Sequence, residues 1–81
     1  MDDAWFQYLE IHDDNQKLWK RLNRLIGESL RTPFEGTGKP EPLKENLSGC
    51  WSRRINKEHR LIYRVTDDAL EILCCVGHYD D

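Results

Sequence analysis

The feature that most constrains the fold is a stretch rich in proline and glycine in the middle of the chain, residues 31–43. It contains Pro33, Gly36, Gly38, Pro40 and Pro42. Each proline lacks a backbone donor and disfavours helical backbone in the residue before it, so no helix can run through this stretch. We therefore interpret the segments before and after it separately.

The segment before residue 31 has helical spacing. We expect a short amphipathic helix from Asp3 to about Glu10, with Trp5, Tyr8 and Leu9 on its apolar face. Asp13 or Asp14 is expected to cap a second helix that runs to about residue 30. Its apolar positions follow a helical repeat and consist of Leu18, Leu22, Leu25, Ile26 and Leu30.

Basic residues of the second helix form a stripe, because Lys17, Lys20, Arg21 and Arg24 recur at helical spacing. All twelve Lys and Arg lie between residues 17 and 64, where there are five acids, so this segment carries about +7 although the whole chain is −3. A local site for a polyanion fits this asymmetry. A solvated surface with uneven charge fits it as well.

The segment after residue 43 alternates as strands do. Trp51 and Ile55 share one face of a first strand, and Arg53 breaks the apolar parity of that face. In a second strand Leu61, Tyr63 and Val65 face one way and Arg60, Ile62 and Arg64 the other. A third strand, from Ala69 to about Val76, is expected to place its alternate residues on one side: Leu70, Ile72, Cys74 and Val76.

These patterns predict an α+β fold in one domain over residues 1–81, with two N-terminal helices packed on an antiparallel sheet. One sheet face meets the helices and the other is lined with arginines. Three cysteines, Cys50, Cys74 and Cys75, make a disulfide framework improbable and lack the spacing of a zinc site, so we expect no metal and no cofactor. With no long apolar run and an acidic start, the chain is expected to be cytoplasmic, without membrane contact.

Glu41 lies between two prolines, in Lys39-Pro40-Glu41-Pro42. The prolines fix an extended backbone, so the carboxylate is presented with little freedom, as a general base requires. A solvated loop residue is the simpler interpretation.

Arg54 and Arg60 lie on consecutive strands on either side of a short turn. Two neighbouring guanidinium groups repel unless an anion joins them, and a phosphate matches their fork geometry. Salt bridges to Glu41, Glu58 or Glu71 would satisfy them equally well.

His78 and Tyr79 follow the last strand. The histidine could protonate a leaving alkoxide and the tyrosine could stack on a base. A terminal tail without a role is the alternative. Together with Glu41, Lys44 and the two arginines, these residues supply a base, an acid and phosphate-binding cations. That set suits attack of a ribose 2′-OH on the adjacent phosphate of RNA.

Residues 31–63, from Arg-Thr-Pro-Phe-Glu-Gly through Trp-Ser-Arg-Arg-Ile to Glu-His-Arg-Leu-Ile-Tyr, closely resemble the YoeB (Txe) toxins of the RelE/ParE superfamily. The resemblance extends from about Ala4 to Tyr79. It implies a RelE-like microbial ribonuclease fold. Family members usually open with a short β-strand before the first helix, and this chain begins inside that helix, so we expect a sheet without that strand.

The resemblance also implies residue roles and partners. Glu41 corresponds to the family's general base, Arg60 to its transition-state phosphate clamp and His78 to its general acid. Lys44, Arg54 and Tyr79 correspond to substrate-binding residues. The implied activity is metal-independent, ribosome-dependent cleavage of mRNA in the A site.

The implied partners are the ribosome and a YefM-like antitoxin, with operator DNA bound only through the antitoxin complex, and a homodimer is possible. A binding module like the ParE branch and an operon co-repressor are the alternative functions.

Overall fold

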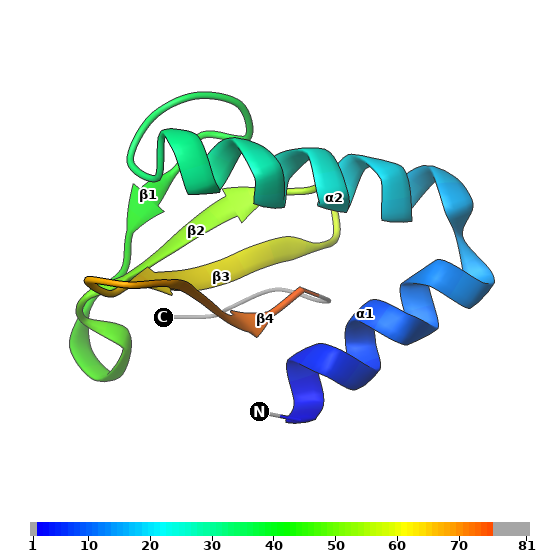
Figure 1. Ribbon diagram of the computed structural model, residues 1–81, viewed down its shortest axis with the longest axis horizontal. Coiled ribbons are helices and arrows are strands. Elements are labelled where there is room, and N and C mark those ends of the chain that lie inside the picture. Colours follow the sequence, from blue (N-terminus) through cyan, green and yellow to red (C-terminus); the bar gives the residue numbers. More distant parts are fainter. Residues whose placement is uncertain (1, 76–81) are drawn as a thin grey trace.

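The computed structural model describes residues 2–75, with helices α1 (Asp2–Asp14) and α2 (Gln16–Arg31) followed by a four-stranded antiparallel sheet (Figure 1). The strands are β1 (Glu41–Pro42), β2 (Cys50–Arg54), β3 (Arg60–Val65) and β4 (Leu70–Cys74), and a 3-10 turn spans Glu45–Leu47. The strands lie side by side in the order β1-β2-β3-β4. The predicted fold class, two helices on an antiparallel sheet, is confirmed.

The boundary between the helices differs from the prediction. α1 continues to Asp14, and Asn15 caps α2 instead of Asp13 or Asp14. Asn15 leaves helical backbone with φ −150°, and its side-chain Oδ1 accepts a hydrogen bond from the Leu18 backbone N–H at 3.0 Å. This is the usual way in which an N-cap satisfies a free donor.

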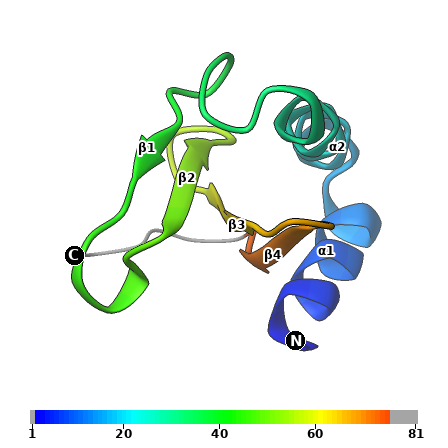
Figure 2. The same ribbon diagram turned by 60° about the vertical axis from the view of Figure 1, so that its left-hand side comes forward.

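One hydrophobic core joins both helices to one face of the sheet. Its buried residues are Ile11 from α1; Leu18, Leu22 and Leu25 from α2; and Ile55, Leu61, Tyr63 and Cys75 from the sheet side. Trp5 and Leu30, which were assigned to the apolar positions of the two helices, are 58% and 64% exposed and lie outside this core. In Figure 2 the two helices lie together on one side of β2, β3 and β4.

A bulge in β4 changes which residues face the core. Tyr63 pairs with Ile72 but Ile62 pairs with Cys74, so Leu73 is an extra residue on β4. Cys74 is therefore removed from the face of Ile72, where it was predicted, and Cys75 turns into the core. Val76, predicted on the same face, lies outside the described residues.

Cys50, Cys74 and Cys75 form no disulfide within residues 2–75. Cys75 is 1% exposed, and its Sγ lies 3.7 Å from the backbone oxygen of Ala4 in α1. Burial, followed by the neighbouring Cys74, raises the pKa of the Cys75 thiol to about 11. No helix within residues 2–75 is long and apolar enough to cross a membrane.

Two leucines of α2 give a matched test of this core. Leu22→Ala removes a side chain that is 0% exposed and should lower the free energy of unfolding by about 2–5 kcal/mol. Leu30→Ala, at an exposed position of the same helix, should change it by about 0.5 kcal/mol or less. Urea unfolding of both variants measures the difference. Equal losses would contradict the assignment of the buried face.

Candidate functional site

Glu41 lies on a strand that was not expected. Residues 41–42 belong to the stretch rich in proline and glycine, for which no strand was predicted, but they pair with β2 in the register Glu41↔Ser52 and Pro42↔Trp51. The Leu43 N–H donates to the backbone oxygen of Cys50 at 2.9 Å and extends the pairing. Proline is tolerated here because β1 is an edge strand. The predicted extended, proline-fixed backbone is present, and the sheet adds a fixed register to it.

That register places Glu41, Arg54 and Arg60 on the same face of the sheet. Glu41 is opposite Ser52, and Arg54 is opposite Arg60. Directly paired residues share a face with Cα atoms about 4.5–5.5 Å apart, and diagonal neighbours such as Glu41 and Arg54 lie about 7–8 Å apart. The core residues Ile55, Leu61 and Tyr63 have the opposite parity. The face with Glu41 is therefore the one without helices, which we call the open face.

The open face was predicted to be lined with arginines, and the structure adds a buried centre to it. Ser52 (5% exposed) and Ile62 (3% exposed) are buried in the row that continues from Glu41 across the sheet. Glu41 and Arg54 are exposed, and Arg60 is half-buried. The charged groups thus border a small buried centre.

The salt bridges proposed as an alternative for Arg54 and Arg60 are not formed within residues 2–75. The ion pairs formed there include His12–Asp13, Arg53–Glu28 and Arg64–Glu71. Glu71 is held by Arg64, whose Nε and Nη2 donate to Oε1 of Glu71 at 2.8 and 2.5 Å. Two guanidinium groups on opposite strands, without a bridging carboxylate among these residues, suit an external anion such as phosphate.

The other predicted site residues are only partly placed. Lys44 is exposed and directly precedes the 3-10 turn, three residues after Glu41. His78 and Tyr79 lie outside the described residues, so their roles stay predictions. No cluster of three His, Cys, Asp or Glu side chains suited to a metal ion occurs within residues 2–75.

Arg53, between the open-face residues Ser52 and Arg54, points to the opposite side and is 0% exposed. Its guanidinium uses five N–H donors on five acceptors, namely the Tyr63 hydroxyl, the Glu28 carboxylate and the backbone oxygens of Thr32, Glu35 and Thr37. The bond to Glu28 Oε2 is 2.9 Å long, and the Tyr63 hydroxyl donates to the Pro33 oxygen at 2.5 Å. The residues from 32 to 37 are thus wrapped around one buried cation.

This wrapped loop leads directly to β1. The Gly38 backbone oxygen accepts from the Arg54 N–H at 2.7 Å, and Gly38 has φ +87°. A Cβ at this position would lie 2.9 Å from the Arg54 oxygen. Only glycine fits both the left-handed backbone and the close approach. Arg53 therefore fixes the loop, and the loop fixes the start of the strand that carries Glu41.

The sequence analysis noted that Arg53 breaks the parity of its strand but assigned it no role. The sequence did contain a signal for the burial of Arg53. Arg53 is a charged residue with the parity of the core, and a second arginine with the parity of the open face follows it. Its acceptors are mostly loop carbonyls, which no sequence pattern reveals.

Hydrogen bonds from Thr37, and then the Arg53 guanidinium, hold the pKa of Glu28 below its ordinary value. Thr37 N donates to Glu28 Oε2 at 2.5 Å. The folded chain therefore favours the ionised carboxylate of Glu28.

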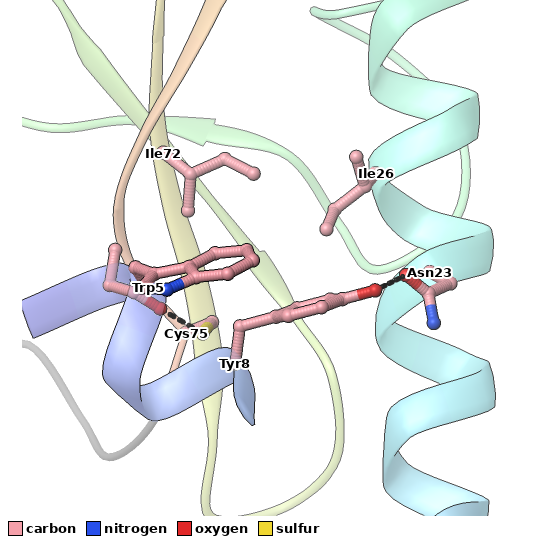
Figure 3. Close-up of a pocket in the computed structure, with 7 residues that line it drawn as sticks. Trp5, Tyr8, Asn23, Ile26, Ile72 and Cys75 are labelled. Atoms are coloured by element: carbon pink, nitrogen blue, oxygen red, sulfur yellow. Dashed lines mark hydrogen bonds between the residues drawn. The ribbon is translucent and has the colours of Figure 1, made fainter. Parts of the chain in front are cut away.

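An apolar pocket of about 450 Å³ lies elsewhere, between α1, α2 and β4 (Figure 3). Trp5, Tyr8, Ile26 and Ile72 line it, and the Tyr8 hydroxyl donates to Asn23 Oδ1 at 2.7 Å. It is on the helix side of the sheet, so it is separate from the open face.

The family model of the YoeB-like toxins of bacterial type II toxin–antitoxin systems matches residues 1–79. "Toxin YoeB" of Escherichia coli K12 is 55% identical over 78 residues, which cover 96% of this chain and 93% of that protein. A YoeB/ParE toxin from Agrobacterium tumefaciens has a similar structure, with a TM-score of 0.93, 41% identity, and coverage of 98% of this chain and 94% of the other. The YoeB chain of a YoeB–YefM complex from Staphylococcus aureus is also similar, with a TM-score of 0.91 and 44% identity. The match covers 98% of this chain and 92% of the other.

Adjacent arginines allow a controlled test of the Arg53 network. Arg53→Lys keeps the charge but cannot fill five spread acceptors, so we expect a loss of about 3 kcal/mol or more in the free energy of unfolding. Arg54→Lys, at an exposed neighbouring position, should change it by about 0.5 kcal/mol or less. Urea unfolding monitored by circular dichroism measures both. A loss below about 1 kcal/mol for Arg53→Lys would contradict the network's importance.

Glu28 gives a test with a defined pH dependence. A carboxyl with a lowered folded pKa adds stability above its ordinary pKa of about 4.5 and loses that contribution as pH falls through the folded pKa. The stability difference between the parent chain and Glu28→Gln should be largest near neutral pH and shrink in acid. Urea unfolding from neutral pH down to about pH 3 measures it. A difference that stays constant over this range would contradict the assignment.

Proposed function

The chain belongs to the YoeB-like toxins of bacterial type II toxin–antitoxin systems, and on this premise we propose that it is an endoribonuclease that cuts messenger RNA on the ribosome. The observation that carries the proposal is the register of β1, β2 and β3, which gathers Glu41, Arg54 and Arg60 on the open face. A carboxylate beside two guanidinium groups can supply the base and the phosphate-binding cations that phosphodiester cleavage by a ribose hydroxyl uses.

The proposed reaction is an internal transesterification. Glu41 takes the proton of a ribose 2′-OH, and the 2′-oxygen bonds to the adjacent phosphorus. The bond from phosphorus to the 5′-oxygen breaks, and His78 protonates that oxygen as it leaves. The products are a 2′,3′-cyclic phosphate and a free 5′-hydroxyl, so atoms and protons balance without a metal or cofactor.

The two arginines have the same task in this scheme. Their guanidinium groups hold the non-bridging oxygens and stabilise the charge that accumulates on the phosphorane. Arg60 is the main clamp, and Arg54, directly opposite it, binds the substrate phosphate. Lys44 and Tyr79 are proposed to contact the mRNA.

The exposure of these groups supports the proposed dependence on the ribosome. Glu41 and Arg54 are exposed on an edge and its neighbouring strand, and an exposed face holds a flexible RNA poorly by itself. Orientation of the reacting groups can supply much of a rate enhancement. We propose that the ribosome holds the mRNA against the open face.

The similarity to the YoeB of a YoeB–YefM complex supports a YefM-type antitoxin as the partner that blocks this activity.

Two exposed glutamates close in sequence, Glu41 of β1 and Glu45 of the 3-10 turn, provide the test. Glu41→Gln should lower cleavage of ribosome-bound mRNA by about 10²–10⁴-fold, because it removes the base. Glu45→Gln, four residues away and also exposed, should cleave like the parent chain. Primer extension on mRNA in purified ribosomes measures the cut sites and their rate.

Cleavage by Glu41→Gln at the parent rate would refute the role of Glu41. Unchanged growth inhibition by both Glu41→Gln and His78→Gln would favour the alternative function, a non-catalytic toxin that acts by binding or represses its operon with the antitoxin.

A further inference from the structure

Lys17, Lys20, Arg21 and Arg24 form a ridge on α2 that the proposed reaction does not use. All four are exposed, and residues 15–27 contain no acid, so this part of the helix carries four positive charges and no negative charge. Most exposed helix faces mix both signs, because opposite charges one turn apart stabilise the helix. A surface of one sign repels itself and is stabilised by an anionic partner. We call these four residues the basic ridge.

Contacts of α2 show which way the basic ridge faces. The Arg21 Nε donates to the backbone oxygen of Ile55 at the end of β2, and Glu28, on the same flank, binds Arg53 of β2. The opposite flank of α2 meets α1, through the hydrogen bond of Tyr8 to Asn23. The basic ridge therefore lies along the β2 side of α2, away from α1 and its apolar pocket.

The basic ridge also adjoins the candidate site. Ile55, which accepts from Arg21, directly follows Arg54, and the short turn after it leads to Arg60. Lys57 is exposed in this turn. The turn also holds the exposed acid Glu58, so the basic ridge and the arginines of the open face adjoin each other across a turn of mixed charge.

We propose that the basic ridge is a second RNA-binding surface, which holds the phosphate backbone of ribosomal RNA while the open face acts on mRNA. The inference rests on the proposed function, because that function brings the chain to the ribosome. From Lys17 to Arg24 the helix rises about 10 Å, so one rigid element presents charges to several successive phosphates.

An acidic protein segment is the competing partner, and the surface fits it less well. Protein interfaces depend on aromatic and other apolar anchors and are depleted in lysine. The exposed large hydrophobic residues within residues 2–75 all lie outside residues 15–27: Trp5, Phe6, Leu9, Leu30, Phe34, Val65 and Leu73. A surface of cations without an apolar anchor suits phosphates, which carry their charge on the outside.

The test measures binding to purified bacterial ribosomes as a function of salt. All chains carry Glu41→Gln, so that the mRNA stays intact, and the ridge variant adds Lys17→Gln, Lys20→Gln and Arg24→Gln. Glutamine keeps the helix propensity, and thermal unfolding checks the fold. We expect the affinity at about 0.15 M salt to fall at least tenfold. The slope of log affinity against log salt should decrease by about 2–3, one for each lost phosphate contact.

A matched control distinguishes the position of the positive charges on the basic ridge from the net charge of the whole chain. Glu10→Gln, Asp14→Asn and Asp67→Asn change three exposed acids and restore the net charge of the ridge variant. If the basic ridge binds RNA, these changes leave the ribosome affinity of the ridge variant low. Recovery of the parent affinity would overturn the proposal, because net charge alone would then explain the loss.

Two further results would also overturn it. One is a ridge variant with the parent's ribosome affinity and salt slope, whether or not the active chain cuts mRNA. The other is unchanged ribosome binding with lost binding of a YefM-type antitoxin, which would make the basic ridge a protein interface. Conversely, a parent chain with Glu41 intact that binds ribosomes through the basic ridge but does not cut mRNA would refute only the proposed function.

Discussion

The buried guanidinium of Arg53 is the interaction on which the rest of the structure depends. Taking a cation out of water is costly unless every donor is satisfied, and Arg53 meets five acceptors. Three of them are backbone oxygens of the loop between α2 and β1, a segment whose prolines and glycines prevent it from forming a helix or a long strand. A loop that could otherwise adopt many conformations is thereby ordered around one side chain of β2.

The consequence for function comes from the two faces of β2. Arg53 faces the helices and orders the loop, while Ser52 and Arg54 belong to the open face. Gly38 joins the two by bonding to the backbone of Arg54, and β1 then places Glu41 opposite Ser52. Along β2, the buried Arg53 that orders the loop is therefore followed directly by Arg54 of the candidate site. A chain of this size can therefore present a carboxylate and two arginines on its surface at fixed spacing.

Much of the fold could be predicted from the sequence, because helical and strand repeats are strong local signals. Both helices, the three longer strands and the shared side of Arg54 and Arg60 were predicted. The two-residue strand β1 was not, because it exists only through pairing with β2. The turn of Cys75 into the core depends on the bulge at Leu73, and the burial of Arg53 depends on loop carbonyls. These features arise from contacts between distant parts of the chain. His78 and Tyr79 stay predictions.

The central claim is that Glu41, Arg54 and Arg60 act on one phosphate. The most direct measurement is the structure, by electron cryomicroscopy, of the Glu41→Gln chain on a ribosome with intact mRNA in the A site. We predict that the substituted side chain lies within hydrogen-bond reach of a ribose 2′-oxygen, about 3 Å, with both guanidinium groups on the adjacent phosphate. A complex in which the mRNA lies away from the open face, with these three side chains in solvent, would contradict the account.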